Sequence, residues 1–368
     1  MTSHPEWNEK TSALAVAAAY ADRIRGRNIA ITGIAPTSVG EGTAMAFASQ
    51  KPAKLFLLSR TREKLEQVAD IIRSTYADVN VHTLFVDLAS QTSIREGAAE
   101  VARLLASGTA TNDNEDGNAK LDILVNNAGV TCRLRRLTAE GIELQFGVNH
   151  IGHFLLTKLL FPLLRKGAEA ESESGVDSSS GRRGGGGMRR GATRVVNVSS
   201  HGHRMSPMRF HDYNILNDRE IPVEEEPKPP LPPAFAKVQP DGYQSLVAYA
   251  QSKTANILFT LHLQEHAKES GVMPYAVHPG GVVSNLGREH EPDVAEAIAK
   301  TAKYWKNSDE GASTTLVAAL DPALDECPGL YLADCQFSAC AAHAQDPSAA
   351  ERLWTLSEEL TGEKFTFG

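Results

Sequence analysis

Short apolar segments alternate with helical segments along most of the chain, and this alternation constrains the fold more than any other feature of the sequence. The apolar runs lie at residues 27–32, 54–59, 79–86, 121–125, 194–200, 272–277 and 329–332. Strands that alternate with helices build a parallel sheet with helices on both faces. We therefore expect an α/β fold, a single Rossmann-type doubly wound parallel sheet of about seven strands.

Three segments interrupt the alternation and are predicted to be loops inserted into one domain, residues 27–345. They lie near residues 107–120, 166–193 and 205–243. The first is polar, the second is rich in Ser, Gly and Arg, and the third contains a proline-rich stretch. That third loop is either a lid over a substrate or a surface excursion. Residues 1–26 are predicted to form an N-terminal helical extension, and residues 346–368 a C-terminal helical tail.

Composition and charge exclude several classes of function. The net charge of -8 gives no electrostatic footprint for nucleic acid. The apolar run at residues 13–19 is too short to span a bilayer and lacks the flanks of a signal peptide, so we expect a cytoplasmic protein. The four cysteines lack zinc-site spacing and are expected to be free thiols. His201 and His203 have no third ligand nearby, so no metal site is predicted.

A glycine-containing turn follows the first predicted strand and precedes a helix. It includes Gly33, Gly40 and Gly42. Glycines between a strand and a helix let the backbone approach a pyrophosphate, and the helix N-terminus supplies free N–H groups. At the end of the second strand no acid is present, whereas Arg60 is. An arginine there accommodates the 2′-phosphate of NADP, although a surface arginine is the alternative.

Further polar residues follow the later strands and lie in the later helices. Asn126-Asn-Ala-Gly129 ends the fourth strand, and Ser199 and Ser200 end the fifth. Asn149 lies inside a long helical run, where its low helix propensity suggests a role for its side chain. Tyr249 and Lys253 are four residues apart, a spacing that places both on one face of a helix. An ammonium near a phenol lowers its pKa from about 10 and makes it usable in proton transfer, although such pairs also occur by chance.

Together these motifs resemble the short-chain dehydrogenase/reductase family, in particular its retinol-dehydrogenase-like and WW-domain-oxidoreductase-like branch and the fungal relatives of that branch. The resemblance extends from about residue 10 to the C-terminus, apart from the inserted loops. The stretches that carry it are Asn126-Asn-Ala-Gly129, Asn149-His-Ile-Gly-His-Phe-Leu-Leu-Thr157, Val196-Asn-Val-Ser-Ser200, Tyr249-Ala-Gln-Ser-Lys-Thr-Ala-Asn256 and His278-Pro-Gly280.

The resemblance implies a catalytic tetrad of Asn149, Ser200, Tyr249 and Lys253. Tyr249 would be the general acid in carbonyl reduction and the base in alcohol oxidation, and Ser200 would hydrogen-bond the substrate oxygen. Lys253 would lower the pKa of the tyrosine and bind the nicotinamide ribose. Asn149 would hold a water in the proton relay. Of the two serines, Ser200 fits the family position better than Ser199.

The resemblance also implies an NADP (NADPH) site. Its contacts would be Thr32, Gly33, Ser38, Val39, Gly40, Arg60, Asp87, Leu88, Asn127, Ala128, Gly129, Tyr249, Lys253, Pro279, Gly280 and Ser284. The glycine motif departs from the family pattern: it is one residue longer, and Ser38 replaces its middle glycine. The Ser38 side chain would either crowd the phosphates or donate to them.

Two functions follow from this sequence. The first is an NADP-dependent oxidoreductase that acts on a small-molecule carbonyl or alcohol. The alternative is an NADP-binding sensor or scaffold of the same fold, which would recruit a partner through the proline-rich loop. A serine hydrolase is disfavoured because the chain lacks a Gly-x-Ser-x-Gly elbow around Ser200. By the same resemblance, a homodimer or homotetramer is expected.

Overall fold

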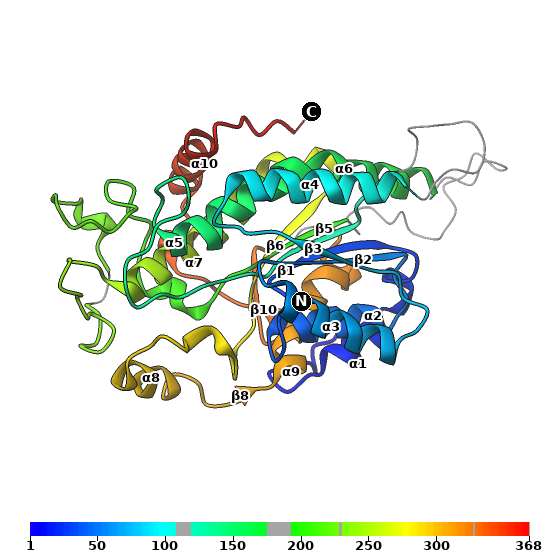
Figure 1. The fold of residues 1–368 in the computed structure, drawn as a ribbon, viewed down its shortest axis with the longest axis horizontal. Coiled ribbons are helices and arrows are strands. Elements are labelled where there is room, and N and C mark those ends of the chain that lie inside the picture. Colours follow the sequence, from blue (N-terminus) through cyan, green and yellow to red (C-terminus); the bar gives the residue numbers. More distant parts are fainter. Residues whose placement is uncertain (108–118, 175–192, 228–229, 327, 368) are drawn as a thin grey trace.

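An eight-stranded sheet forms the centre of the protein in a computed structural model that describes residues 1–107, 119–174, 193–227, 230–326 and 328–367 (Figure 1). The strand order is β10-β9-β6-β5-β4-β1-β2-β3, and every pairing is parallel except that of β10 with β9. The strands are β1 Asn28–Thr32, β2 Lys54–Ser59, β3 Val81–Phe85, β4 Ile123–Asn126, β5 Arg194–Val198, β6 Met273–His278, β9 Tyr331–Ala333 and β10 Gln336–Phe337. The predicted doubly wound parallel sheet is confirmed, with one strand more than expected.

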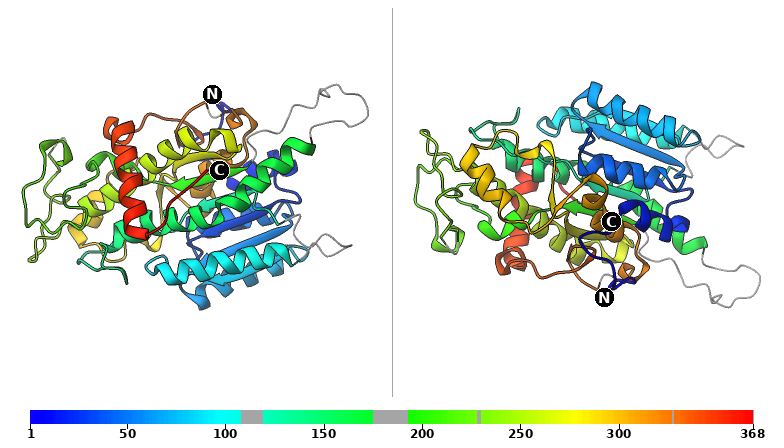
Figure 2. Two further views of the ribbon diagram at one scale, coloured as in Figure 1. Left: turned by 90° about the horizontal axis from the view of Figure 1, so that it is seen from above. Right: turned by 90° about the horizontal axis from the view of Figure 1, so that it is seen from below.

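Helices cover both faces of the sheet (Figure 2). Alternate residues of β1 point to opposite faces: Ile29 and Ile31 pack in one hydrophobic cluster and Ala30 in another. The first face carries α1 Ala13–Ala19, α2 Val39–Ala48, α3 Arg62–Thr75 and α9 Ser308–Leu320. The second face carries α4 Gln91–Ala106, α6 Gly152–Ser174 and α7 Ser245–His266. Because both faces of each strand are buried, the strands are nearly continuous apolar runs.

Further elements pack on or around these layers. Among them are α5 Leu144–Phe146, a π-helix Gly147–Ile151 that leads into α6, α8 Pro292–Ala299, α10 Pro347–Thr361, and a two-stranded sheet of β7 Gly281–Val282 and β8 Trp305–Lys306. Val148 of the π-helix and Trp354 of α10 are buried in the same cluster as the second face. The last predicted strand, residues 329–332, begins two residues later than expected, and β7, β8 and β10 were not predicted. These short strands have too few residues for a period-2 pattern to be visible.

The terminal segments pack on the main fold. Ala13, Val16 and Ala17 of α1 are buried in the same cluster as the sheet, so the predicted extension is part of the core. Within the predicted helical extension, α1 ends at Ala19 and a separate 3-10 turn covers Ala21–Arg23. At the other end, α10 packs against α7. The division into a main domain and two extensions stays a prediction.

Two of the predicted insertions fall largely outside the described residues: positions 108–118 of the first and 175–192 of the second. The second prediction was wrong at its start, because α6 continues as helix to Ser174. Cys132, Cys335 and Cys340 are free, as expected, and Cys327 lies outside the described residues. Among the described helices, none combines the length and apolarity that a membrane span requires.

Candidate active site

A cleft of about 340 Å³ opens at the carboxyl edge of the sheet, above β1 and β4. β1 pairs with β2 on one side and with β4 on the other, so the chain reverses its winding direction at this point. Such a switch point is where open α/β sheets bind ligands. The cleft is lined by residues 32–36, 38–39, 58–61, 64, 86–88, 127–130, 148, 198–199, 249, 253, 279, 284–286 and 288.

The glycine turn forms one wall of the cleft. Gly33 has a φ of +79°, and a Cβ on it would lie 2.5 Å from Cα of Ala128. A Cβ on Gly40 would lie 2.4 Å from the carbonyl oxygen of Gly33. Only glycine therefore allows β1, α2 and the end of β4 to approach this closely. Gly42 has a different role, because it packs against the backbone of Ser308 at the start of α9.

Ser38, which replaces a glycine of the family pattern, is the N-cap of α2. Its hydroxyl donates to the carbonyl of Ala35 at 2.6 Å and accepts from the backbone N–H of Glu41 at 3.1 Å. The side chain is therefore turned toward its own helix end, where it satisfies one of the N–H groups that a helix leaves free. Ser38 still lines the cleft together with Val39.

The end of the cleft that follows β2 is basic. Arg60 and Lys64 line it after β2, and Arg60 forms no ion pair with any residue that the structure describes. Asp87, which follows β3, uses Oδ1 to accept from the N–H of Ala89 at 3.0 Å. A cation without a carboxylate partner is free to meet an anionic group of a ligand.

Tyr249 lines the other end of the cleft, and Ser200 lies next to it. Burial raises the pKa of the Tyr249 phenol, and a hydrogen bond with Ser200 opposes that rise. Gly202 lies against the ring, where a Cβ would come within 3.1 Å of Tyr249 Cε1. The hydroxyl of Ser200 accepts from Gly202 N–H at 3.0 Å, whereas that of Ser199 is buried and donates to the carbonyl of Lys253 at 2.8 Å. The two adjacent serines therefore have different partners, and Ser200 Oγ lies beside the Tyr249 ring on the same side of Gly202.

Lys253 lies one turn of α7 beyond Tyr249 and is 3% exposed. Its Nζ donates to the carbonyl of Val198 at 2.9 Å and lies 5.7 Å from the centre of the Tyr249 ring. Burial lowers the pKa of Lys253 to about 7. The expected effect of Lys253 on the pKa of the tyrosine stays a prediction.

Asn149 is fully buried in the π-helix that precedes α6. Its Oδ1 accepts from the N–H of Val130 at 2.8 Å, and its Nδ2 donates to the Val130 carbonyl at 3.1 Å and to Ser252 Oγ at 2.9 Å. Its main-chain oxygen accepts from Asn256 Nδ2 at 2.7 Å. The side chain thus joins the end of β4 to α7. A role in holding a water stays a prediction.

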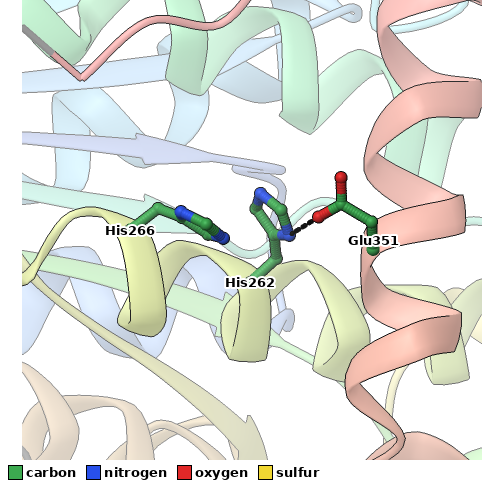
Figure 3. Close-up of side chains that lie close together, drawn as sticks. All are labelled: His262, His266 and Glu351. Carbon is green, nitrogen blue, oxygen red and sulfur yellow. Dashed lines mark ion pairs between the residues drawn. The ribbon is translucent and has the colours of Figure 1, made fainter.

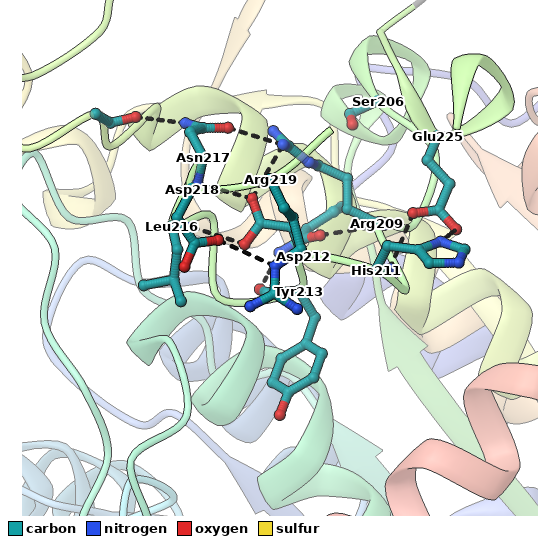
Figure 4. Close-up of polar contacts among 12 residues, drawn as sticks. Ser206, Arg209, His211, Asp212, Tyr213, Leu216, Asn217, Asp218, Arg219 and Glu225 are labelled. Carbon is teal, nitrogen blue, oxygen red and sulfur yellow. Dashed lines mark hydrogen bonds and ion pairs between the residues drawn. The ribbon is translucent and has the colours of Figure 1, made fainter. Parts of the chain in front are cut away.

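The third inserted loop is held by a buried polar network (Figure 4). Arg209 pairs with Asp212 at 3.1 Å and donates to Asn217 Oδ1 at 2.8 Å. Glu225, only 3% exposed, accepts from His211 Nδ1 at 2.8 Å. None of the described residues of this loop lines the large cleft. Ala234, Phe235, Lys237 and Gln239 instead line a small hollow beside His290.

Most of the predicted contacts surround the cleft. Gly40, Asn149, Ser200 and Gly280 do not line it: Gly40 packs beneath the glycine turn, and Gly280 lies against Lys306. Sequence reasoning missed several lining residues, which lie beside the motifs or at positions within them that were not singled out as contacts. These are Ile34, Ala35, Pro36, Leu58, Ser59, Thr61, Lys64, Val86, Val130, Val148, Val198, Ser199, Asn285, Leu286 and Arg288.

Known proteins resemble this chain in sequence and in fold. Residues 27–175 match a family model described as short chain dehydrogenase. Retinol dehydrogenase 12 of Mus musculus is 33% identical over 340 residues, which cover 92% of this chain and 88% of that protein. Oxidoreductase fscI of Fusarium equiseti is 34% identical over 272 residues, 74% of this chain and 93% of that protein. The angucycline C-6 ketoreductase LanV, solved with bound NADP, superimposes with a TM-score of 0.58 at 18% identity, over 85% of this chain and 95% of LanV.

Proposed function

The chain belongs to the short-chain dehydrogenase/reductase family, in its retinol-dehydrogenase-like group, and we propose that it transfers hydride between NADP(H) and a small-molecule carbonyl or alcohol. Its family makes it an oxidoreductase that acts on alcohols or carbonyls. The choice of NADP and the roles of individual residues are the proposal. The observation that carries it is the meeting of Tyr249 with Ser200 at one end of a cleft whose other end is basic.

The cleft fits a dinucleotide. A Cβ on Gly33 or Gly40 would fill the turn between β1 and α2, where a backbone cradle for the pyrophosphate is needed. Arg60 and Lys64 supply positive charge where the 2′-phosphate of NADP would lie. We infer that Arg60 is the main determinant of the preference for NADP over NAD.

Proton transfer falls to the protein, while bound NADP(H) donates or accepts the hydride. Tyr249 would donate its hydroxyl proton to the substrate oxygen in reduction and take it back in oxidation. Ser200 would donate a hydrogen bond to the same oxygen and hold it beside the phenol. Lys253, placed by its bond to Val198, would donate a hydrogen bond from another N–H to a hydroxyl of the nicotinamide ribose. Asn149 would position Val130 and α7 rather than contact the substrate.

The proposal is tested by NADPH oxidation with a panel of aldehydes, ketones and quinones. The wild-type chain should reduce at least one of them, and Tyr249→Phe should lower kcat by about 100-fold or more while NADPH still binds. Tyr304→Phe is the matched control, since that hydroxyl contacts Glu310 and does not line the cleft. Turnover that survives in Tyr249→Phe would contradict the assigned role. Tight NADPH binding without turnover of any substrate would favour the sensor.

The cofactor preference has its own test. Arg60→Gln should weaken NADPH binding about 10- to 100-fold, the worth of a charge-assisted contact, and leave NADH binding unchanged. Arg62→Gln is the control, because its guanidinium lies 4.9 Å from the Phe85 ring and does not line the cleft. Equal losses for NADPH and NADH would show that Arg60 does not read the 2′-phosphate.

A further inference from the structure

Two histidines of α7 and one glutamate of α10 come together away from the cleft (Figure 3). His262 and His266 are four residues apart and therefore project from the same face of α7. Glu351 faces them from α10, with Oε2 lying 3.4 Å from His262 Nδ1. One ligand atom from each residue can be chosen so that all three lie within 4.8 Å of one another. None of these residues lines the cleft.

Packing holds the histidine at the centre of this group. The His262 ring stacks on Trp354 of α10 and on His266, with a centroid distance of 4.1 Å in each pair. Throughout the described ranges, no hydrogen bond engages a ring nitrogen of His262 or His266. The imidazoles are thus oriented by ring contacts and, for His262, by the nearby Glu351 carboxylate, which would itself be a ligand.

The exposure and the chemistry of the group suit metal binding. His266 and Glu351 are exposed, which gives an ion a path of entry and lets both side chains rotate toward it. Two histidines and one carboxylate form a common set of three protein ligands for Zn²⁺, with a fourth position left for water.

We propose that His262, His266 and Glu351 form a binding site for a divalent transition metal ion, Zn²⁺ in particular, that fastens α10 to α7. Tetrahedral coordination at about 2.0–2.1 Å requires ligand atoms roughly 3.3 Å apart. The pair of His262 and Glu351 is already near that spacing at 3.4 Å, so the exposed His266 would make most of the movement. The ion would stabilise the C-terminal helix and would take no part in hydride transfer.

The test uses the full-length protein after treatment with a chelator, and follows Co²⁺ by visible absorption and Zn²⁺ by calorimetry. The wild-type chain should bind one ion with a tetrahedral Co²⁺ spectrum, and Zn²⁺ should displace the Co²⁺. His266→Gln and Glu351→Gln should each weaken binding at least tenfold. Glu265→Gln and Glu359→Gln are the controls, because these exposed carboxylates lie on the same two helices outside the group.

A thermal unfolding measurement completes the test. Zn²⁺ at about one hundred times its Kd should raise the Tm of the wild-type chain by about 3 °C, and a chelator should reverse the rise. Without metal, His266→Gln and Glu351→Gln should unfold at the same temperature as the wild type, which shows that both variants fold. Equal Zn²⁺ affinity and Tm shift in the wild type and in these two variants would overturn the site. A wild-type chain that binds no Zn²⁺ or Co²⁺ in a saturable, one-to-one manner would also overturn it.

Discussion

The hydroxyl of Thr32 lies 2.9 Å from Nε2 of His153, and this buried hydrogen bond joins the end of β1 to the start of α6. Nδ1 of His153 donates to the main-chain oxygen of Asn149 at 3.0 Å, so Nε2 is the acceptor and the threonine is the donor. The same hydroxyl accepts from the N–H groups of Asn127 and Ala128, at 3.0 Å each. Thr32 thus fixes both the floor of the cleft and the helix that carries Asn149.

Thr32→Val should therefore destabilise the protein and weaken the cofactor site together. The isosteric change leaves two partly buried N–H groups and one buried ring nitrogen without partners, a cost of about 1–3 kcal/mol. Urea denaturation gives the change in the free energy of unfolding, and fluorescence titration gives the Kd for NADPH. Thr32→Ser retains the hydroxyl and should stay near wild type in both measurements. A fully stable Thr32→Val would show that the hydroxyl is not needed.

The adjacent serines give a second prediction. Ser200→Ala removes the hydroxyl that interacts with Tyr249 and should lower kcat by about 10²- to 10³-fold, as expected for loss of a donor to the reacting oxygen. Ser199→Ala removes only a bond to the Lys253 carbonyl and should cost about 1 kcal/mol of stability with kcat within a few-fold. Steady-state kinetics and urea denaturation of both variants separate the two effects. The reverse ranking in kcat would exchange the roles of Ser199 and Ser200.

Two glycines with similar backbone angles allow strain and steric contact to be separated. Gly26 has a φ of +73° and no neighbouring atom within 4 Å of a Cβ, whereas Gly33 has a φ of +79° and faces Ala128 Cα at 2.5 Å. Gly26→Ala should cost about 1 kcal/mol, the price of a left-handed alanine. Gly33→Ala adds to the same backbone strain a steric overlap between the new Cβ and Ala128 Cα. This variant should therefore be less stable than Gly26→Ala and should bind NADPH more weakly than the wild type. Equal stabilities in urea would show that the backbone at Gly33 yields.

The main sheet was predictable because burial on both faces leaves β1, β2, β4, β5 and β6 as continuous apolar runs. The π-helix and the bonds of Asn149 were not, because they depend on contacts with Val130 and Ser252, far away in the sequence. The packing of Lys253 beneath the tyrosine ring likewise depends on the depth of burial, which spacing along a helix does not report. Motifs therefore predicted which residues surround the cleft better than how each one is bonded.

The proposed metal site likewise could not be predicted from the sequence alone. His262 and His266 have a chelating spacing that is visible in the sequence, but Glu351 joins them only because α10 packs on α7. A pair of histidines on a helix carries no information about a third ligand almost ninety residues away, so the sequence alone predicted no metal site. The signal that was available is the four-residue spacing itself.

The buried histidines make stability depend on pH. Burial lowers the pKa of His150 to about 3 and that of His153 to about 4, below the value of about 6.5 expected for an unfolded chain. Between these values the unfolded state binds more protons than the folded state, so stability rises with pH. Above about pH 6.5 both histidines are neutral in the folded and the unfolded states, so the stability of the protein is not reduced. As the pH falls from 6.5 toward 4, protonation in the unfolded state lowers the stability of the fold. At pH 5 each histidine should have lowered the free energy of unfolding by up to about 2 kcal/mol relative to its value above pH 6.5.

Urea denaturation of the full chain at several pH values from 7.5 to 5 measures this dependence. The free energy of unfolding should fall steadily below pH 6.5. His150→Gln keeps a polar side chain beside Ser357, whose hydroxyl lies 2.8 Å from His150 Nε2, and removes the titrating group. Because one fewer proton is then taken up on unfolding, the slope near pH 5 should decrease by about one proton. An unchanged slope in His150→Gln would mean that this histidine is protonated in the folded state, and its burial against Phe146 and Phe259 would then have to open in acid.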